Sequence, residues 1–555
     1  MSVDFQLENL KFGHVREIDG HTITVIADKL ECHNENKEYT VEIGSYVHLA
    51  APKSDLIGII SGIKVVQTQV TNSNGQLLLE DRKHVLITLV GFLQSGTTFE
   101  RGIERYPVIG TYTYLLTEAA IESMFSGVFE NGIPIGERCQ RGGGIEFARI
   151  DKLFGRHTAI LGTTGSGKSW TVASLLQSAM EVMPSTRLIF LDLHDEYRNA
   201  FPEDFSRLGR KVTHLTSHNI KLPYWCLNID ELQELFISTE HSAQNQVAIF
   251  KTIVRELRVN YSNDLNISEN KLSADTPVYF KFEDLLQRLR DLDTQMVDGS
   301  SASTKKQGPF HGKLTNLIMR METISSDPRY NFLFPSERMD NQGLQELFEE
   351  LLGFKNKTQM TVIDLSGLPS EILSIIVGIL CRLAFEYKYW DLDPQHLPIT
   401  LVLEEAHNYL PNSDFARHRI CIERVERVAR EGRKYGLNLM IVSQRPSELN
   451  ETILSQCGNF ITLRLTNPND QAYVKKLLPD FLAVAIDMLP HLRTGEAIIT
   501  GEAVELPTRV RIPRPDPHPK SQDVKYEKWW RCGVPNNYSV EQVINRWRQR
   551  VRLES

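Results

Sequence analysis

The stretch AILGTTGSGKSWTV, which begins at Ala159, has residue types and a spacing that suit phosphate binding. It matches the pattern Gly-x-x-x-x-Gly-Lys-[Ser/Thr] at Gly162, Gly167, Lys168 and Ser169. Apolar residues precede the motif and a helix-like run follows it, which is the context in which this pattern forms a P-loop. The alternative is a glycine-rich turn that binds nothing, which the Lys-Ser pair directly after the last glycine disfavours.

The chemistry expected of this loop is the binding of ATP together with Mg²⁺. Glycines allow successive backbone N–H groups to converge on phosphate oxygens, and the N-terminus of the following helix adds a partial positive charge. Lys168 would reach the β- and γ-phosphates, and the Ser169 hydroxyl would bind Mg²⁺. We expect the nucleotide to contact Gly162, Thr163, Thr164, Gly165, Ser166, Gly167, Lys168, Ser169 and Trp170.

Two adjacent acidic residues supply the other groups that hydrolysis needs. In ITLVLEEAHNYL, an apolar strand (399–403) ends in Glu404 and Glu405. Glu404 stands where a P-loop enzyme places the acid that holds Mg²⁺, and Glu405 stands where it places the base that polarises the attacking water. Because glutamate is one methylene longer than the commoner aspartate, the metal contact of Glu404 could run through water. An acidic strand end without a catalytic role is the alternative.

Polar residues also end two other strands. In IVSQRP, Gln444 ends the strand after the acidic one, where it could sense the γ-phosphate and orient water, or could satisfy backbone groups of a turn. In FLDLHDEYRNAF, Asp192, Asp195 and Glu196 follow an earlier strand. They could lie near Mg²⁺ or bind a ribose, or could cap the following helix. Both choices stay open at this point.

A basic helix provides candidates for a cation shared between subunits. The helix, ARHRICIERVERVAREGRKYG, has an apolar stripe of Cys421, Val425 and Val428. Arg430 lies about 140° around the helix from Val425 and points away from the stripe. Arg430 or Arg433 could reach the γ-phosphate of an adjacent subunit, and Arg156, just before the first core strand, is a further candidate. A solvated basic face is the alternative.

These residues require a sheet whose strands end at one edge. From His157 onward, apolar runs of strand length alternate with helical segments. The runs are HTAILG, TRLIFLDLH, QMTVIDLSG, ITLVLEEAH, NLMIVSQRP, NFITLRLT and GEAIITG. Near-continuous apolar runs suit strands buried on both faces, so the pattern predicts an α/β core with a mostly parallel sheet.

The flanking regions differ from this core. Residues 1 to about 130 have short β-branched runs between turn residues, which predicts a small barrel or sandwich, and residues 133–144 are expected to be a linker or loop. An insertion at about 228–357 is predicted to be mostly helical. Residues 511–522 are proline-rich and predict an extended connector. Ser539-x-x-Gln542 then predicts the capped start of a C-terminal helix.

The composition is that of an ordinary globular protein with a negative charge. Lys and Arg number 62 and Asp and Glu number 70, which gives a net charge of −8. Because proteins that coat nucleic acid are usually basic, any DNA contact is expected on a local basic surface such as the lumen of a ring. The seven cysteines form no C-x-x-C pair, which favours reduced thiols in a cytoplasm. No apolar run is long enough to predict a membrane helix.

Together, these motifs resemble those of the HerA family of hexameric DNA translocases, relatives of the FtsK and VirB-type ATPases. The resemblance covers most of the chain and follows the family's order. It rests on GRHTAILGTTGSGKSWTVASLL, LDLHDEY, LVLEEAHNYLP, VAREGRKYGLNLMIVSQRPSELN, ILSQCGNFITLRLTNPND and LRTGEAIITG. The implied domains are a HAS-barrel-like domain (1–135), a RecA-like P-loop core (136–227 and 358–510), a helical insertion (228–357) and a C-terminal arm (511–555).

The resemblance also implies a homo-hexameric ring around double-stranded DNA, with ATP between subunits. In such a ring Arg430 would be the first candidate, and Arg156 the second, to reach a neighbour's nucleotide. HerA proteins act with the NurA nuclease in end resection, and bacterial relatives act with sirtuin-like or other effectors in phage defence. We therefore expect an ATP-dependent DNA translocase or helicase that acts with a nuclease or another effector.

Two other functions are compatible with the sequence. A scaffold or regulatory ATPase ring would assemble and activate an effector, and the negative net charge favours it, because DNA affinity comes from phosphate neutralisation. A conjugation-type coupling protein would move DNA across a membrane, which the lack of a membrane-spanning run disfavours. DNA-stimulated ATP turnover and strand displacement would distinguish the translocase from the scaffold.

Overall fold

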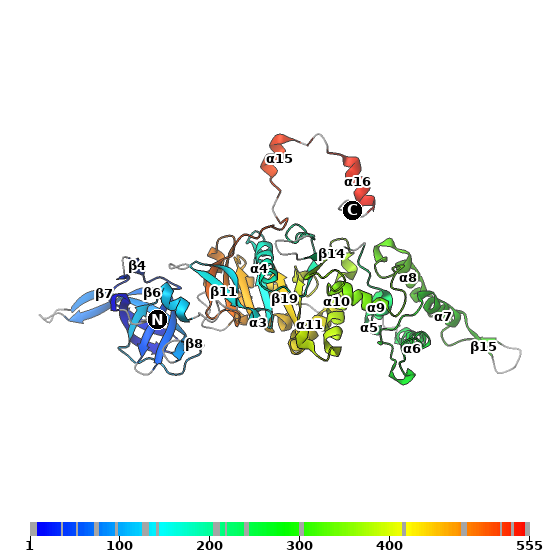
Figure 1. The fold of residues 1–555 in the computed structure, drawn as a ribbon, viewed down its shortest axis with the longest axis horizontal. Coiled ribbons are helices and arrows are strands. Elements are labelled where there is room, and N and C mark those ends of the chain that lie inside the picture. Colours follow the sequence, from blue (N-terminus) through cyan, green and yellow to red (C-terminus); the bar gives the residue numbers. More distant parts are fainter. Residues whose placement is uncertain are drawn as a thin grey trace. The chain divides into compact units, whose positions relative to one another are not determined.

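The structure is a computed structural model that describes residues 8–20, 22–34, 37–51, 54–71, 77–94, 98–124, 132–139, 144–203, 211–216, 219–237, 244–298, 305–412, 418–478, 486–521, 524–533, 535 and 538–549. The chain divides into two compact units. The first consists of Met1–Val182 and Met440–Asp516, and the second of Met183–Leu439 and Pro517–Ser555. Figure 1 labels the helices and strands along the chain. Within the described ranges, every helix is too short or too polar to cross a lipid bilayer.

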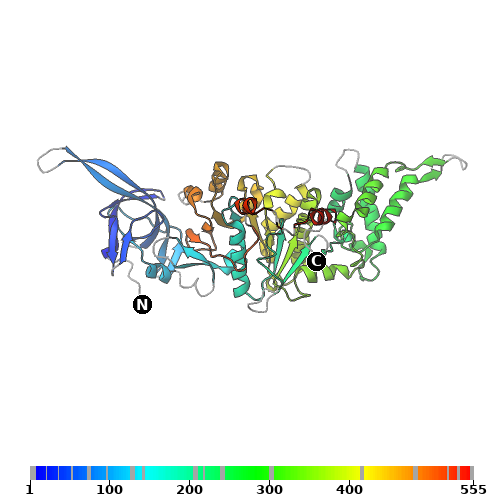
Figure 2. The ribbon, with the colours of Figure 1, turned by 90° about the horizontal axis from the view of Figure 1, so that it is seen from above.

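An antiparallel barrel begins the first unit. Its strands are β1 (Lys11–Asp19), β2 (Thr22–Ala27), β5 (Tyr46–Ala51), β6 (Ser54–Thr71), β7 (Leu77–Gln94) and β9 (Tyr112–Leu115). They follow the order β2-β1-β9-β5-β6-β7, and pairing of β2 with β7 closes the barrel. Alternate residues of β2 are buried, as a strand with one face toward a core requires. The β6–β7 hairpin extends beyond the barrel (Figure 2). The expected β-barrel is confirmed.

A second sheet of the first unit contains the strand that leads into the glycine-rich loop. β12 (His157–Leu161) pairs in parallel with β19 (Leu437–Ser443) and with β20 (Cys457–Leu463). Beyond β20 the pairing becomes antiparallel, which the apolar run GEAIITG did not reveal. The antiparallel strands are β21 (Glu496–Gly501), β22 (Thr508–Arg511), β10 (Gly132–Arg138) and β11 (Ile145–Arg149).

The expectation of a linker or loop at residues 133–144 is wrong in its first half, because residues 132–138 form β10. Ile133 and Ile135 alternate toward the core and are buried. Pro134 and Gly136 flank a register shift in the pairing with β11, and a Cβ on Gly136 would lie only 2.7 Å from the carbonyl oxygen of Arg511. Strands tolerate proline and glycine at such bulges and close approaches, so these residues did not mark a loop here.

The second unit contains a parallel sheet with the strand order β18-β13-β17-β14. Its strands are β18 (Ile399–Leu403), β13 (Leu188–Asp192), β17 (Met360–Asp364) and β14 (Val212–Thr216). Every residue of β13 and β18 is buried, as their near-continuous apolar sequences predict. β14 was not among the expected strands, because VTHLT is short and half polar. Helices α10 (Ser370–Trp390) and α11 (Arg419–Glu431) pack against each other.

The insertion is mostly helical, as its composition predicted. Its helices are α5 (Ile229–Phe236), α6 (Gln244–Asn260), α7 (Phe282–Thr294), α8 (Thr315–Ser326) and α9 (Gly343–Leu351). Asn228 and Glu231 form a capping box that starts α5. Arg258 of α6 is fully buried and donates to the carbonyl oxygens of Trp225 (3.3 Å) and Leu227 (2.7 Å). The fold is therefore an α/β, RecA-like P-loop core with an N-terminal β-barrel and a helical insertion.

The C-terminal arm follows β22. Residues 512–521 form no helix or strand, in agreement with the predicted extended connector. α15 (Tyr526–Cys532) was not expected, whereas α16 (Val540–Gln549) is the predicted C-terminal helix. The hydroxyl of Ser539 accepts the backbone N–H of Gln542 at 3.2 Å, which caps the start of α16 as predicted.

Candidate nucleotide-binding site

The glycine-rich loop joins β12 to α4 (Lys168–Val182) in the first unit. Gly165 and Gly167 have φ angles of +73° and +97°, a region that residues with a Cβ rarely adopt. Nothing lies within 4 Å of the position that a Cβ on Gly165 would take, so the loop is open there. Lys168 begins the helix and is buried. An open glycine turn at a helix N-terminus with an adjoining lysine fits the binding of nucleotide phosphates.

Backbone hydrogen bonds hold this loop between neighbouring segments of the first unit. They run from the N–H of Gly162 to the oxygen of Ser443 (3.2 Å), from the N–H of Thr163 to the oxygen of Arg464 (3.0 Å) and from the N–H of Gly495 to the oxygen of Ser166 (2.9 Å). These hydrogen bonds fix the loop at three points, at the end of β19, just after β20 and just before β21. Its N–H groups are therefore oriented before any ligand binds. Such preorganisation lowers the entropic cost of binding phosphate.

Gln444 follows β19 and lies beside the glycine-rich loop. The hydroxyl of Thr164 donates to Gln444 Oε1, and both residues belong to the first unit. A pocket of about 310 Å³ adjoins them and is lined by Thr163, Thr164, Gln444, Arg445, Ser447, Glu448, Asn467 and Asp470. A polar side chain at this place can orient water near a bound phosphate, and its role as a sensor stays a prediction.

Glu404 and Glu405 lie at the end of β18 in the second unit. Both are almost fully buried. The Glu404 carboxylate accepts the backbone N–H of Leu193 at 3.4 Å, and Tyr409 donates its hydroxyl to the Glu404 carbonyl oxygen at 2.8 Å. Glu405 has φ +48° and ψ +43°, a left-handed conformation that only a sharp turn imposes on a glutamate. Buried carboxylates in a tight turn after a parallel strand suit the predicted metal-binding and base roles, which stay predictions.

Asp192 organises the loop that follows β13. It is fully buried and accepts the backbone N–H groups of His194 (3.2 Å), Glu196 (3.4 Å) and Tyr197 (3.0 Å). Burial raises the pKa of Asp192 to about 7, against the effect of these hydrogen bonds. Asp195 has φ +55° and accepts Arg198 Nε at 3.2 Å. Asp192 thus shapes the loop whose Leu193 N–H contacts Glu404. Residues 193–203 form no helix, so the alternative that Asp192 caps a following helix is wrong.

The three arginine candidates have different surroundings. Arg430 is more than half exposed and pairs with Glu426 one helical turn away at 2.9 Å. Arg156 is mostly buried and pairs with Glu502 at 3.0 Å. Arg433 is exposed in a short 3-10 turn after α11 (Gly432–Tyr435). The apolar stripe opposite Arg430 is buried, as expected; it comprises Cys421, Val425 and Val428.

One contact beside the glycine-rich loop was missed by the sequence analysis. The guanidinium of Arg514 lies 4.7 Å from the centre of the Trp170 ring, a distance suited to a cation–π interaction. The N–H of Asp516 donates to Gln177 Oε1 of α4 at 3.2 Å, which holds the same segment along the helix. No signal in the sequence links Arg514 to Trp170, because they meet only through the return of the chain after β22.

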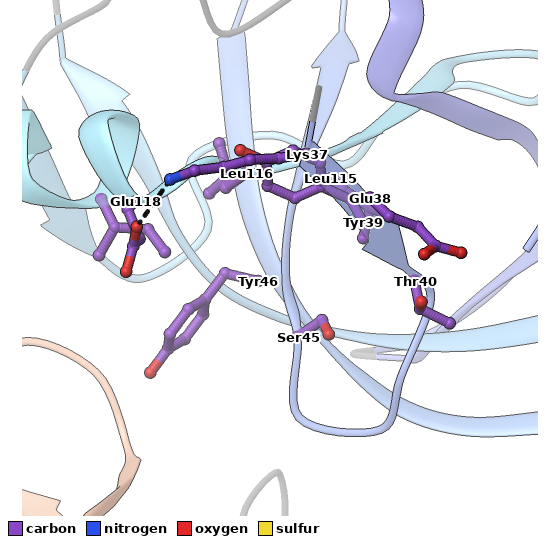
Figure 3. Close-up of a pocket in the computed structure, with 10 residues that line it drawn as sticks. Lys37, Glu38, Tyr39, Thr40, Ser45, Tyr46, Leu115, Leu116 and Glu118 are labelled. Atoms are coloured by element: carbon purple, nitrogen blue, oxygen red, sulfur yellow. Dashed lines mark ion pairs between the residues drawn. The ribbon is translucent and has the colours of Figure 1, made fainter. Parts of the chain in front are cut away.

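A separate pocket of about 330 Å³ lies in the barrel (Figure 3). An ion pair between Lys37 Nζ and Glu118 Oε2 (3.6 Å) spans one side of it, and Tyr46 lies on another. Tyr46 donates its hydroxyl to the carbonyl oxygen of Pro507 at 3.1 Å, in the connection between β21 and β22. The pocket contains none of the residues predicted to bind the nucleotide.

Comparison with known proteins identifies the family. The model "Helicase HerA, central domain" matches residues 135–384, and "Helicase HerA-like C-terminal" matches residues 389–514. The DNA double-strand break repair helicase HerA of Sulfurisphaera tokodaii is 30% identical, with 73% of each chain covered. That of Pyrococcus furiosus is 28% identical, also with 73% of each chain covered.

Two further similarities extend the comparison. The probable helicase MJ1565 of Methanocaldococcus jannaschii is 25% identical over 88% of this chain and 90% of that protein. Among solved structures, VirB4 of Thermoanaerobacter pseudethanolicus is 14% identical, with a TM-score of 0.44 over 72% of this chain and 98% of that chain. The matched models span most of the chain, including the glycine-rich loop, Glu404, Glu405 and Gln444. This chain belongs to the HerA helicase family of P-loop ATPases and is an ATP hydrolase.

Proposed function

We propose that this protein assembles into a hexameric ring that hydrolyses ATP with Mg²⁺ to move double-stranded DNA and that delivers the DNA to a nuclease or another effector. The observation that carries the proposal is the preorganised glycine-rich loop with Gln444 beside it, in a chain of the HerA family. The relatives named as DNA double-strand break repair helicases support DNA as the substrate.

Each of the predicted site residues has its own part in hydrolysis. The N–H groups from Gly165 to Ser169 and the Lys168 ammonium bind and neutralise the phosphates, while Ser169 and Glu404 hold Mg²⁺. Bound ATP supplies the phosphoanhydride bond whose cleavage drives movement. Glu405 accepts the proton of the attacking water, and Gln444 orients that water. The burial of Lys168, Glu404 and Glu405 supports these roles, because electrostatic interactions are stronger where water is excluded.

The arm supports assembly into a ring. Trp530 and Trp547 are 81% and 72% exposed, and no described residue of α15 is buried. Large exposed aromatic side chains on a helix mark a surface that binds protein. We propose that residues 517–555 clasp a neighbouring subunit. The net charge of −8 places DNA contacts on a local basic surface, such as the channel of the ring.

A ring that activates an effector without moving DNA is the second candidate, and the negative net charge is the observation that favours it. The two candidates differ in how DNA affects the ATPase. A translocase hydrolyses ATP faster when duplex DNA is present and displaces a triplex-forming strand from that duplex. A regulatory ring shows ATP turnover that responds to its effector and not to DNA.

The test measures ATP hydrolysis with and without blunt duplex DNA, together with triplex displacement, on the full chain. Lys168→Ala, which is expected not to hydrolyse ATP, serves as the matched control. We expect DNA to stimulate turnover several-fold and displacement to require both ATP and Lys168. Unchanged turnover and no displacement, with intact rings, would favour the regulatory ring. Affinity capture from the native host, followed by assays for nuclease and NAD hydrolysis, identifies the class of the effector.

A further inference from the structure

Two segments that flank the β21–β22 hairpin lie beside the glycine-rich loop, within the first unit. Before β21, Gly495 donates its N–H to the Ser166 oxygen at 2.9 Å, and Thr494 donates its hydroxyl to the Gly165 oxygen at 3.3 Å. After β22, the N–H of Ile512 donates to the Gly495 oxygen at 2.8 Å. The chain that leaves β22 therefore passes directly beside the segment that holds the loop.

The same chain then continues along helix α4. The Arg514 guanidinium lies 4.7 Å from the centre of the Trp170 ring. The N–H of Asp516 donates to Gln177 Oε1 at 3.2 Å, about two turns further along α4 than Trp170. Because Ile512 and Asp516 are both hydrogen-bonded, the backbone is fixed on either side of Arg514. This arrangement holds the guanidinium over the ring.

Trp170 stands where a nucleotide bound at this loop would continue beyond its phosphates. It directly follows Ser169 in the first turn of α4. A P-loop binds phosphates with its backbone and with the start of its helix, so the ribose and the base extend from this end of α4. Arg514 is exposed although its guanidinium lies over Trp170. A guanidinium plane stacks both on aromatic side chains and on nucleobases.

We propose that Arg514 is the base-stacking residue of the nucleotide site and that Trp170 orients its guanidinium. The ligand is a nucleoside diphosphate or triphosphate, whose phosphates bind the loop and whose base stacks on Arg514. This inference rests on the proposed role of the glycine-rich loop as the phosphate site. Because stacking needs only the π-face of a base, Arg514 adds affinity for adenine and guanine nucleotides alike. The stack is the same before and during hydrolysis, so it lowers KM and leaves kcat unchanged.

Two other roles of Arg514 would give different results. If Arg514 attracted the phosphates by its charge, a lysine would replace it, and inorganic tripolyphosphate would lose affinity together with the nucleotides. If Arg514 only anchored the chain to α4, its removal would lower the melting temperature and leave nucleotide affinity unchanged. A base-stacking residue instead affects only ligands that carry a base, and it requires the planar group that lysine lacks.

The experiment measures, for the full chain with Mg²⁺, the Kd of ADP and of GDP and the inhibition constant of inorganic tripolyphosphate against ATP hydrolysis. Arg514→Ala and Arg514→Lys are compared with wild type. Arg511→Ala is the matched control, because it removes an exposed arginine at the end of β22 and leaves Arg514 on Trp170. We expect both Arg514 variants to weaken ADP and GDP at least about fivefold and to raise the KM for ATP accordingly. Both kcat and the tripolyphosphate constant should stay within about twofold of wild type, and Arg511→Ala should change none of these values.

Several outcomes would overturn the inference. They are an unchanged Kd for ADP and GDP in Arg514→Ala, full affinity in Arg514→Lys, an equal loss for tripolyphosphate, and a loss for only one of the two bases. The proposed phosphate site fails separately, if Lys168→Ala binds ADP as tightly as wild type. If Arg514→Ala does not fold, as judged by its melting temperature, Trp170→Leu removes the support of the guanidinium and should weaken ADP and GDP in the same way. An unchanged Kd in that variant would overturn the inference as well.

Discussion

Arg156 forms an ion pair with Glu502 within one chain, with 3.0 Å between Nε and Oε1. Lys152 also pairs with Glu502, at 3.3 Å. Burial by itself would raise the pKa of Glu502, but hydrogen bonds from Arg156 and Lys152 hold this pKa below its usual value. Arg156 would have to leave this pair to reach a neighbour's nucleotide. Arg430 is more than half exposed and pairs with Glu426 one helical turn away. Such a pair contributes about 0.3–0.5 kcal/mol, so Arg430 is released more easily.

Arg430 is therefore expected to act on the nucleotide of the adjacent subunit. Arg430→Ala should bind ATP and assemble, yet hydrolyse ATP about 10³-fold or more slowly, the scale of an arginine finger. Mixing Arg430→Ala with Glu405→Gln subunits rebuilds complete sites at some interfaces, so the mixed rings should regain turnover that neither variant has alone. No recovery in rings shown by mass to be mixed would exclude action between subunits and direct the test to Arg433 and Arg156.

Lys168→Ala is expected to abolish ATP hydrolysis without unfolding the protein. The substitution removes the positive charge that the phosphates require, while the backbone contacts of the loop stay in place. Turnover and melting temperature measured on the same preparation check both parts. Near-normal turnover would remove the assignment of this loop as the phosphate site.

Glu405→Gln and Glu404→Gln are expected to affect different steps: the first slows hydrolysis itself, and the second changes the Mg²⁺ requirement. Glu405→Gln should bind ATP and hydrolyse it at least about 10²-fold more slowly, because a base is lost. Glu404→Gln should raise the Mg²⁺ concentration needed for half-maximal turnover, because a metal-binding charge is lost. A titration of turnover against Mg²⁺ distinguishes them, and identical titration curves for both variants would contradict the separate roles.

Removal of residues 517–555 is expected to weaken the ring and to leave the glycine-rich loop intact. The cut keeps Arg514 on Trp170 and Asp516 on Gln177 while it removes α15 and α16. Mass photometry at several protein concentrations with an ATP analogue should show a shift from hexamer to smaller species. As a matched test, Trp530→Ser with Trp547→Ser should shift assembly in the same direction. An unchanged fraction of hexamer in the truncated chain would show that the arm does not hold neighbouring subunits together.

Asp192 is expected to make stability depend on pH in metal-free buffer. Its pKa of about 7 in the folded protein lies above the value of about 3.9 for an unfolded chain. Between these values the folded state binds more protons, so stability falls as pH rises from about 4 to about 7, by up to about 1.4 kcal/mol per pH unit. The difference in melting temperature between wild type and Asp192→Asn should therefore change over this range and level off above it. A constant difference would contradict the raised pKa.

The local motifs could be predicted because their physics is local. Gly162 to Ser169 are consecutive or nearly so, and a turn with positive φ angles at Gly165 and Gly167 needs only glycines at the right spacing. The apolar runs of β12, β13 and β18 predicted buried strands because each strand is covered on both faces. β10 was not predicted, because its proline and glycine lie at a bulge whose position depends on the neighbouring strands.

The sequence by itself determined that the chain is a P-loop ATPase of HerA type, and it predicted which residues bind phosphate, bind Mg²⁺ and act as the base. Only the tertiary structure decided that Thr164 contacts Gln444, that Glu502 holds Arg156, and that Arg514 lies on Trp170. Each of these pairs joins residues hundreds of positions apart. Their contact depends on which strands are neighbours in the sheet and on the path of the chain after β22. The periodicity of the sequence predicts neither.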